Sequence, residues 1–228
     1  MIRDVPISSS LRHLSASPAL TTTETHFSAG TPLECSPKLA GLVWQSNPDL
    51  FGFFYGGEKS HLKKLLAAEW PSQTGFFSHQ NFTIASQNSQ PIGLLNCFAG
   101  KMMSEIYQTH LQLIPGVLKA DAAARLVRGL VAMGWLFPFV PRDALYVFNL
   151  AVSQKARGLG VGAKLMALVE EKAKSEGLKS IHLDTPSTSR AIKFYQQLGY
   201  QIFVETRLCQ LREDENVPSH NRMVKTLI

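Results

Sequence analysis

The 228-residue sequence has few cysteines, and those it has are isolated. Cys35, Cys97 and Cys209 are far apart and form no CxxC pair. An odd number of scattered thiols is typical of a protein in a reducing compartment and argues against a disulfide framework. The seven histidines form neither an HExxH pattern nor a paired Cys/His spacing. The sequence therefore predicts no metal site.

The sequence also lacks a long apolar run. A membrane-spanning helix needs about 20 consecutive apolar residues, and the richest stretch, Leu130–Val140, is short and contains Gly134 and Pro138. The start of the chain shows no basic segment followed by an apolar run and a cleavage site, which a secretory signal requires. We therefore expect a cytoplasmic protein with no membrane partner.

Charge of one sign is in modest excess. The chain carries 23 Lys and Arg against 17 Asp and Glu, a formal net charge of +6. The basic residues are interleaved with acidic ones, which does not favour nucleic-acid binding. A small polyanionic ligand is the better match for such a surplus.

Residues 1–36 are rich in Ser, Thr and Pro and show neither helical nor strand periodicity. Such a composition cannot bury enough apolar surface to offset the entropy of ordering, so it predicts a disordered tail. One domain is then expected over 37–228. In its first half the periodicity predicts helices and a hairpin: helices at Lys38–Trp44, Asp49–Tyr55, Lys59–Trp70 and Asp121–Trp135, and strands at Phe82–Ser86 and Pro91–Ala99.

The last third of the chain alternates between strands and helices. Leu145–Val152 is almost wholly apolar, as expected for a strand buried on both faces. The elements predicted after it are helices at Leu159–Ser175 and Thr188–Leu198, and strands at Ser180–Asp184, Tyr200–Thr206 and Arg222–Leu227. This alternation predicts the α/β or α+β class with a mixed sheet.

A glycine-rich loop joins the first of these strands to its helix. Gly158, Gly160 and Gly162 remove side chains where a ligand must approach the backbone closely. The first amides of a helix have no internal partners and lie at its positive end, so the loop, with Arg157 beside it, predicts a pyrophosphate site. A flexible loop with an incidental arginine is the plain alternative.

A dinucleotide fingerprint fits the same residues, as Gly158-x-Gly160-x-x-Ala163 with Asp184 at the end of the next strand. Two observations disfavour it. Ser153–Arg157 separate the strand from the glycines, and only 44 residues follow Asp184.

Two linked motifs resemble those of the GNAT superfamily of N-acetyltransferases. The first is Arg157-x-x-Gly160-x-Gly162; the second is Ala191-Ile192-Lys193-Phe194-Tyr195, followed by Leu198-Gly199-Tyr200. The resemblance covers about residues 145–206, and a weaker likeness upstream is to small bacterial members. It implies a mixed central sheet with helices on both faces. It also implies acetyl transfer from acetyl-coenzyme A directly to a primary amine of a small molecule or a peptide.

The resemblance further implies where the cofactor binds. Leu150, Ala151 and Val152 would border the pantetheine arm, at a bulge where a backbone amide binds the thioester carbonyl. The pyrophosphate would rest on Arg157 and on the amides of Gly158, Leu159, Gly160, Val161 and Gly162. Thr188 stands where the family often has Asn, and as a helix cap it would still offer a hydroxyl. Tyr195 would face the sulfur as the general acid.

The general base is where the sequence departs from the family. Many members carry a Glu on the strand before the loop, but Tyr146–Val152 contains no carboxylate. Asn149 is the catalytic candidate, as the residue that positions a water, and Asp143, Glu105 and Glu205 are alternatives. The missing carboxylate also leaves open a non-catalytic acyl-coenzyme A-binding module.

Several other residues receive structural interpretations. The apolar helix faces predict that Trp44, Trp70 and Trp135 belong to the core. His110 and His182 are expected on strands or strand edges as structural histidines. The helix Asp121–Trp135 is a candidate substrate-side or dimer element, with core packing favoured, and both a monomer and a homodimer stay open.

Overall fold

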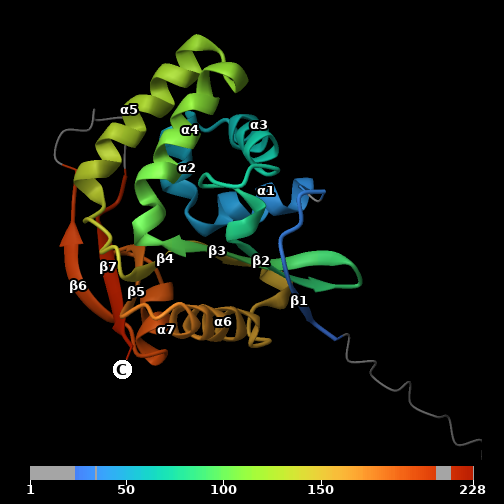
Figure 1. The fold of residues 1–228 in the computed structure, drawn as a ribbon, viewed down its shortest axis with the longest axis vertical. Coiled ribbons are helices and arrows are strands. Elements are labelled where there is room, and N and C mark those ends of the chain that lie inside the picture. The colour runs from blue at the N-terminus through green and yellow to red at the C-terminus, as the bar shows by residue number, and fades with distance from the viewer. Residues whose placement is uncertain (1–23, 34, 209–216, 228) are drawn as a thin grey trace, which may run out of the picture.

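A computed structural model of the protein describes residues 24–33, 35–208 and 217–227. Its described strands form one sheet of seven, in the order β1-β2-β3-β4-β5-β7-β6 (Figure 1). Only the β4–β5 pair is parallel, and the other pairs are antiparallel. The strands are β1 (His26–Ala29), β2 (Phe82–Gln87), β3 (Gln90–Ala99), β4 (Ala144–Val152), β5 (Ser180–Pro186), β6 (Gln201–Thr206) and β7 (His220–Thr226). The predicted class, with a mixed sheet, is confirmed.

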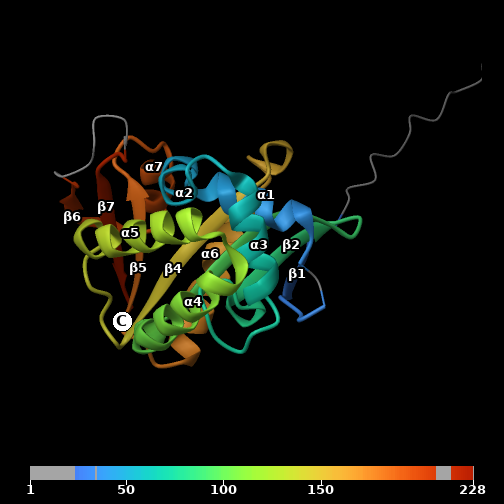
Figure 2. The same cartoon turned by 90° about the horizontal axis from the view of Figure 1, so that it is seen from above.

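Helices cover both faces of the sheet. One face carries α1 (Pro37–Ser46), α2 (Pro48–Tyr55), α3 (Lys59–Glu69), α4 (Met103–Val117) and α5 (Ala120–Leu136), onto which Figure 2 looks. The other face carries α6 (Val161–Ser175) and α7 (Ala191–Gln197). Each layer has its own apolar core, because side chains alternate along β3: Leu94 and Phe98 face the first layer, Leu95 and Cys97 the second.

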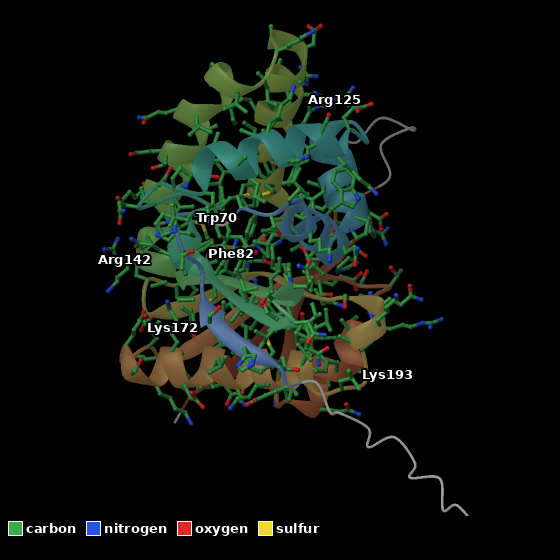
Figure 3. All side chains as sticks on the ribbon, turned by 90° about the vertical axis from the view of Figure 1, so that its right-hand side faces the viewer. Trp70, Phe82, Arg125, Arg142, Lys172 and Lys193 are labelled. Atoms are coloured by element: carbon green, nitrogen blue, oxygen red, sulfur yellow. The ribbon has the colours of Figure 1, made fainter. Side chains whose placement is uncertain are left out.

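The first strand corrects the prediction of a disordered segment up to residue 36. His26–Ala29 pairs with β2, and the indole Nε1 of Trp70 donates a 2.7 Å hydrogen bond to the Thr31 carbonyl just after it. Trp70 packs on Phe82 with ring centroids 4.9 Å apart (Figure 3). These partners are remote in sequence, so no local periodicity marks this strand. Residues 1–23 lie outside the described residues, and the expectation for them stays a prediction.

The helix α4 has no counterpart in the sequence analysis. It contains Pro115 and also His110, which was expected on a strand or strand edge. His110 Nδ1 lies 3.0 Å from Glu69 Oε2, and both side chains are buried. The structural interpretation of His110 thus agrees with its contacts, although its element was wrong.

The helix α5 extends the predicted one by a residue at each end, but one expectation about it was wrong. Trp44 and Trp70 are buried, whereas Trp135 is 80% exposed. The buried face of α5 is formed by Leu126, Leu130 and Met133, and Trp135 lies on the opposite side of the helix. None of the described helices is long and apolar enough to span a membrane.

Candidate active site

The parallel pair β4–β5 opens partway along its length. The two strands pair only from Ala144 to Val147 on β4, and beyond Val147 the described residues place no strand beside that edge. On its other edge β4 stays paired with β3, but Val147 and Asn149 match consecutive β3 residues, so Phe148 is an extra residue. This bulge increases the local twist and opens a gap between the strands.

Backbone donors of β4 point into this gap. The Ser153 amide donates to the Ile92 carbonyl at 2.7 Å, on the β3 side. Because successive amides in a strand point to opposite sides, those of Val152 and Leu150 point to the gap. A ligand lying along Leu150–Val152 would find the hydrogen-bonding groups of an unpaired strand edge.

The loop after β4 leads into α6 through two glycines in the left-handed region. Gly158 has φ 80° and Gly160 has φ 76°, although an added Cβ at either would meet nothing within 4 Å. Backbone conformation rather than lack of space therefore requires glycine here.

The N-terminus of α6 is open to a ligand. Gly160 is the N-cap residue and offers no side-chain hydrogen bond. The first hydrogen bond of the regular helix pattern joins the Lys164 amide to the Gly160 carbonyl at 3.0 Å. The amides of Val161, Gly162 and Ala163 precede that bond and lie at the positive end of the helix. Arg157 Nε donates to the Val152 carbonyl at 3.3 Å, which ties the loop to the end of β4. The arrangement suits an anionic group.

Residues of the helix α7 lie beside the residues of β4 that border the gap. Tyr195 is 8% exposed, and burial raises the pKa of its phenol, so the hydroxyl keeps its proton at neutral pH. An added Cβ at Gly162 would lie 3.4 Å from Phe194 Cζ. That is an ordinary van der Waals distance, so packing against Phe194 of α7 does not itself require glycine at this position.

These parts surround one cleft of about 620 Å³, here called the main cleft. Nine of the residues predicted to bind the cofactor line it: Leu150, Ala151, Val152, Arg157, Gly158, Gly160, Val161, Gly162 and Tyr195. Leu159 and Thr188 are not among its lining residues. Ser189 lines it instead, and its Oγ accepts the Ala191 amide at 3.1 Å, the capping contact expected of Thr188. A hydroxyl two residues before the helix was the signal that could have found it.

A smaller hollow of about 90 Å³, the bulge pocket, lies beside the main cleft. Phe148, Asn149 and Asp184 line it, together with residues of the α1–α2 junction. The two hollows share Ser46, Leu150, Ser189, Ala191 and Tyr195. Tyr195 therefore stands where they meet.

Both polar atoms of the Asn149 side-chain amide form hydrogen bonds. Its Oδ1 accepts from Asn96 Nδ2 at 3.2 Å, and its Nδ2 donates to Ser46 Oγ at 2.9 Å. The side chain is 4% exposed and links β4 to β3 and to α1. Its catalytic role stays a prediction, and these contacts favour a positioning role.

The carboxylates considered as a base lie elsewhere. Asp143 pairs with Lys179 at 3.0 Å at the start of β4, and Glu205 accepts from Ser219 Oγ at 2.6 Å on the edge strand. Glu105 is in the first turn of α4. None of the three is among the residues that line the main cleft or the bulge pocket.

Sequence reasoning missed the carboxylate that does line the bulge pocket. Asp184 Oδ1 and Oδ2 accept from Arg222 Nε and Nη2 at 2.8 and 2.7 Å, and Oδ2 also accepts from Tyr146 Oη at 2.8 Å. The Arg222 and Asp184 side chains are 1% and 3% exposed. Both oxygens thus accept hydrogen bonds from the guanidinium, and the contacts of Asp184 are those of a structural ion pair. In the described residues, no group of three or more His, Cys, Asp or Glu could hold a metal ion.

A bulged strand that parts from its parallel neighbour beside an open helix N-terminus is the arrangement that the resemblance implied. The chain belongs to the acetyltransferase (GNAT) family, whose model matches residues 44–200. The family is thus the one that the resemblance implied, a family of acetyltransferases rather than of dinucleotide-dependent oxidoreductases.

Individual relatives support the same assignment. The chain is 34% identical over 67 residues to an acetyltransferase of Agrobacterium fabrum, a match that covers 29% of this chain and 48% of that protein. The matched segment therefore spans about half the length of that curated relative.

Solved structures share the fold. An N-acetyltransferase from Staphylococcus aureus Mu50 superposes with a TM-score of 0.68 at 13% identity, over 88% of this chain and 100% of its own. A Bacillus subtilis acetyltransferase in complex with CoA gives a TM-score of 0.51 at 14% identity, over 90% and 100% of the two chains. At such identities the likeness concerns the fold alone.

Proposed function

We propose that this enzyme transfers an acetyl group from acetyl-coenzyme A directly to a primary amine. The observation that carries the proposal is that three features of the site border the same cleft. The unpaired edge of β4, the N-terminus of α6, which has no side-chain cap, and the residue Tyr195 all border the main cleft.

The main cleft fits coenzyme A in size and in chemistry. Its volume of about 620 Å³ is typical of small-molecule sites. The amides of Val161 and Gly162, with the Arg157 guanidinium, would hold the pyrophosphate, because donors at a positive helix end favour anions. The edge of β4 from Leu150 to Val152 would hold the amide groups of the pantetheine arm as a partner strand does.

Acetyl-coenzyme A supplies the thioester that the amine attacks. The protein contributes backbone hydrogen-bond donors and the proton of a tyrosine hydroxyl group. The gap-facing amides of Leu150 and Val152 stabilise negative charge on an oxygen atom beside the bulge, which is a large contribution to acyl transfer. Tyr195 holds a proton on its Oη and donates it to the leaving thiolate.

The amine must lose a proton, and the described residues that line the two hollows offer no carboxylate without a partner to accept it. Asp184 is the one carboxylate among the described residues lining the two hollows, and Arg222 binds both of its oxygens. We therefore assign removal of this proton to solvent reaching the bulge pocket. This assignment is consistent with the absence of a carboxylate from Tyr146–Val152.

Calorimetric titration with acetyl-coenzyme A, with NADH as the control ligand, tests the cofactor. We expect micromolar binding of acetyl-coenzyme A and no heat from NADH, because the cleft offers a helix N-terminus and a strand edge without the remainder of a dinucleotide domain. Thiol release in the presence of a panel of amines then tests the transfer. Absence of acetyl-coenzyme A binding would remove the support for the proposal.

A further inference from the structure

An apolar groove lies next to the bulge pocket, on the side away from the main cleft. Its volume is about 130 Å³, and it is lined mainly by α4, by the end of α5 with the segment after it, and by β4. We call it the aromatic groove; it is lined by Phe76, Met103, Tyr107, Met133, Gly134, Phe137, Pro138, Phe139, Val140, Tyr146, Phe148 and Arg222. It shares Phe137, Tyr146 and Phe148 with the bulge pocket. The two hollows therefore adjoin at three aromatic side chains.

The walls of the groove are rings in contact with one another. The Phe76 and Phe148 rings are stacked with centroids 4.9 Å apart, and Phe76 meets Tyr107 edge-on at 5.4 Å. Tyr146 and Phe148 have centroids 6.4 Å apart. Rings held by their neighbours form a rigid apolar surface, against which an aromatic ligand gains both burial and ring contacts.

The groove presents no uncompensated charge among its lining residues. Arg222 is the one charged side chain in the lining, and each of its three guanidinium nitrogens already donates a hydrogen bond within the protein. Besides Asp184, its guanidinium binds the carbonyls of Pro138 at 2.7 Å and Phe139 at 3.3 Å. A polyamine would find no carboxylate there, and a ligand carboxylate would meet an arginine that is already paired. Charged substituents on the acceptor would thus lose solvation without gaining a partner.

Size limits the apolar group. A cavity of about 150 Å³ lined by apolar side chains holds one benzene molecule, and the aromatic groove of about 130 Å³ is close to that. The bulge pocket of about 90 Å³ lies between the groove and Tyr195, and it has room for a short chain that ends in an amino group.

We propose that the acceptor is a primary amine joined by a short linker to a single ring-sized apolar group, which lies in the aromatic groove while the amino group lies in the bulge pocket. This inference rests on the proposed function, since it names the class of amine that the same site acetylates.

The test uses Gly134, which lines the groove from within α5. An added Cβ there meets nothing within 4 Å, so Gly134→Leu causes no backbone conflict, and we expect the leucine side chain to narrow the groove that this residue lines. Gly116→Leu is the matched control: Gly116 lies in α4, its added Cβ also meets nothing within 4 Å, and it lines none of the three hollows. Both changes replace a helical glycine by a better helix former.

Calorimetry with 2-phenylethylamine, in the absence of acetyl-coenzyme A, measures the groove apart from the reaction. We expect the natural protein and Gly116→Leu to bind it equally, and Gly134→Leu to bind it about tenfold more weakly because the ring loses its burial. Spermidine should bind more weakly than 2-phenylethylamine. In thiol-release assays the ring-bearing amine should have the higher kcat/KM, and Gly134→Leu should raise its KM while acetyl-coenzyme A affinity stays unchanged.

Two results would overturn the inference: preference for spermidine over 2-phenylethylamine, or equal binding of 2-phenylethylamine by the two leucine variants. Failure of the proposed function would look different, because acetyl-coenzyme A would then not bind even where 2-phenylethylamine does.

Discussion

The two sides of the site are built in different ways. The main cleft takes its ligand-binding groups largely from backbone atoms of one continuous segment, residues 150–163, together with Arg157 and Tyr195. The bulge pocket and the aromatic groove are lined mainly by side chains from five helices (α1, α2, α4, α5 and α7), three strands of the sheet and the loops between them. The binding properties of a site built from backbone atoms depend on backbone conformation. Those of a site built from side chains depend on which side chains pack together in the fold.

This difference indicates which side of the site changes its shape when side chains are substituted and which side does not. Substitutions along Leu150–Val152 leave the amides of β4 in place, so that edge tolerates changes of apolar side chain. The groove changes its shape with every substitution of Phe137 or Phe148. We infer that the acceptor can change between relatives while the cofactor site stays the same, as is usual when function is grafted on a shared fold.

The largest effect is expected at Tyr195, where the two sides meet. Tyr195→Phe removes the hydroxyl but keeps the ring, so turnover should fall about 100-fold while acetyl-coenzyme A binds as before. Steady-state kinetics and calorimetry measure the two quantities separately. Tyr200→Phe is the control, since the Tyr200 ring contacts that of Tyr195 with centroids 5.9 Å apart but lines neither hollow. Unchanged turnover in Tyr195→Phe would exclude the general-acid role.

A smaller effect should follow from Gly160→Val. Valine at φ 76° is strained by about 1–2 kcal/mol, and relief of that strain would move the first amides of α6. Acetyl-coenzyme A affinity should fall about tenfold. Gly177→Val places the same residue at φ 67° at the other end of α6, away from the main cleft. If both variants bind acetyl-coenzyme A equally well, the helix N-terminus is not the anion site.

The smallest effect is expected on the pH dependence of stability, and it concerns the side of the site that is built from side chains. His220 Nδ1 lies 2.8 Å from the Pro218 carbonyl, which can only accept, so Nδ1 carries the proton and Nε2 accepts from Asn47 Nδ2 at 3.0 Å. Burial lowers the pKa of His220. Its contribution to stability is therefore present above the usual histidine pKa of about 6.5 and is lost as the pH falls below it.

Asn47→Asp tests this contact. Aspartate still caps α2, and it accepts a hydrogen bond from protonated His220. Between pH 7.5 and 5 the free energy of unfolding of the natural protein should fall by about 1 kcal/mol more than that of the variant. Burial also lowers the pKa of His182, to about 4, but this acts equally in both proteins and cancels in the difference. Parallel pH profiles from denaturant unfolding would contradict the assignment.

Local patterns in the sequence predicted most of the fold and most of the segment that lines the main cleft. Helices and strands with clear periodicity, such as α3 and β4, were located to within about two residues. The glycine loop was predicted as well, because left-handed conformation and a helix start leave their mark within a few residues. The pairing of β1 with β2 and the helix α4 around Pro115 were not predicted, since contacts distant in sequence decide both.

The sequence by itself thus determined the mixed sheet, the loop Arg157–Gly162 and the position of Tyr195 on α7. Only the tertiary structure decided that Asn149 links β4 to Ser46, that Asp184 is bound by Arg222, and that Phe137 and Phe148 meet beside the bulge pocket. The physical reason is the separation in sequence over which each kind of interaction acts. Backbone conformation and periodicity are set by neighbouring residues, whereas a pocket between elements is set by which distant side chains pack together.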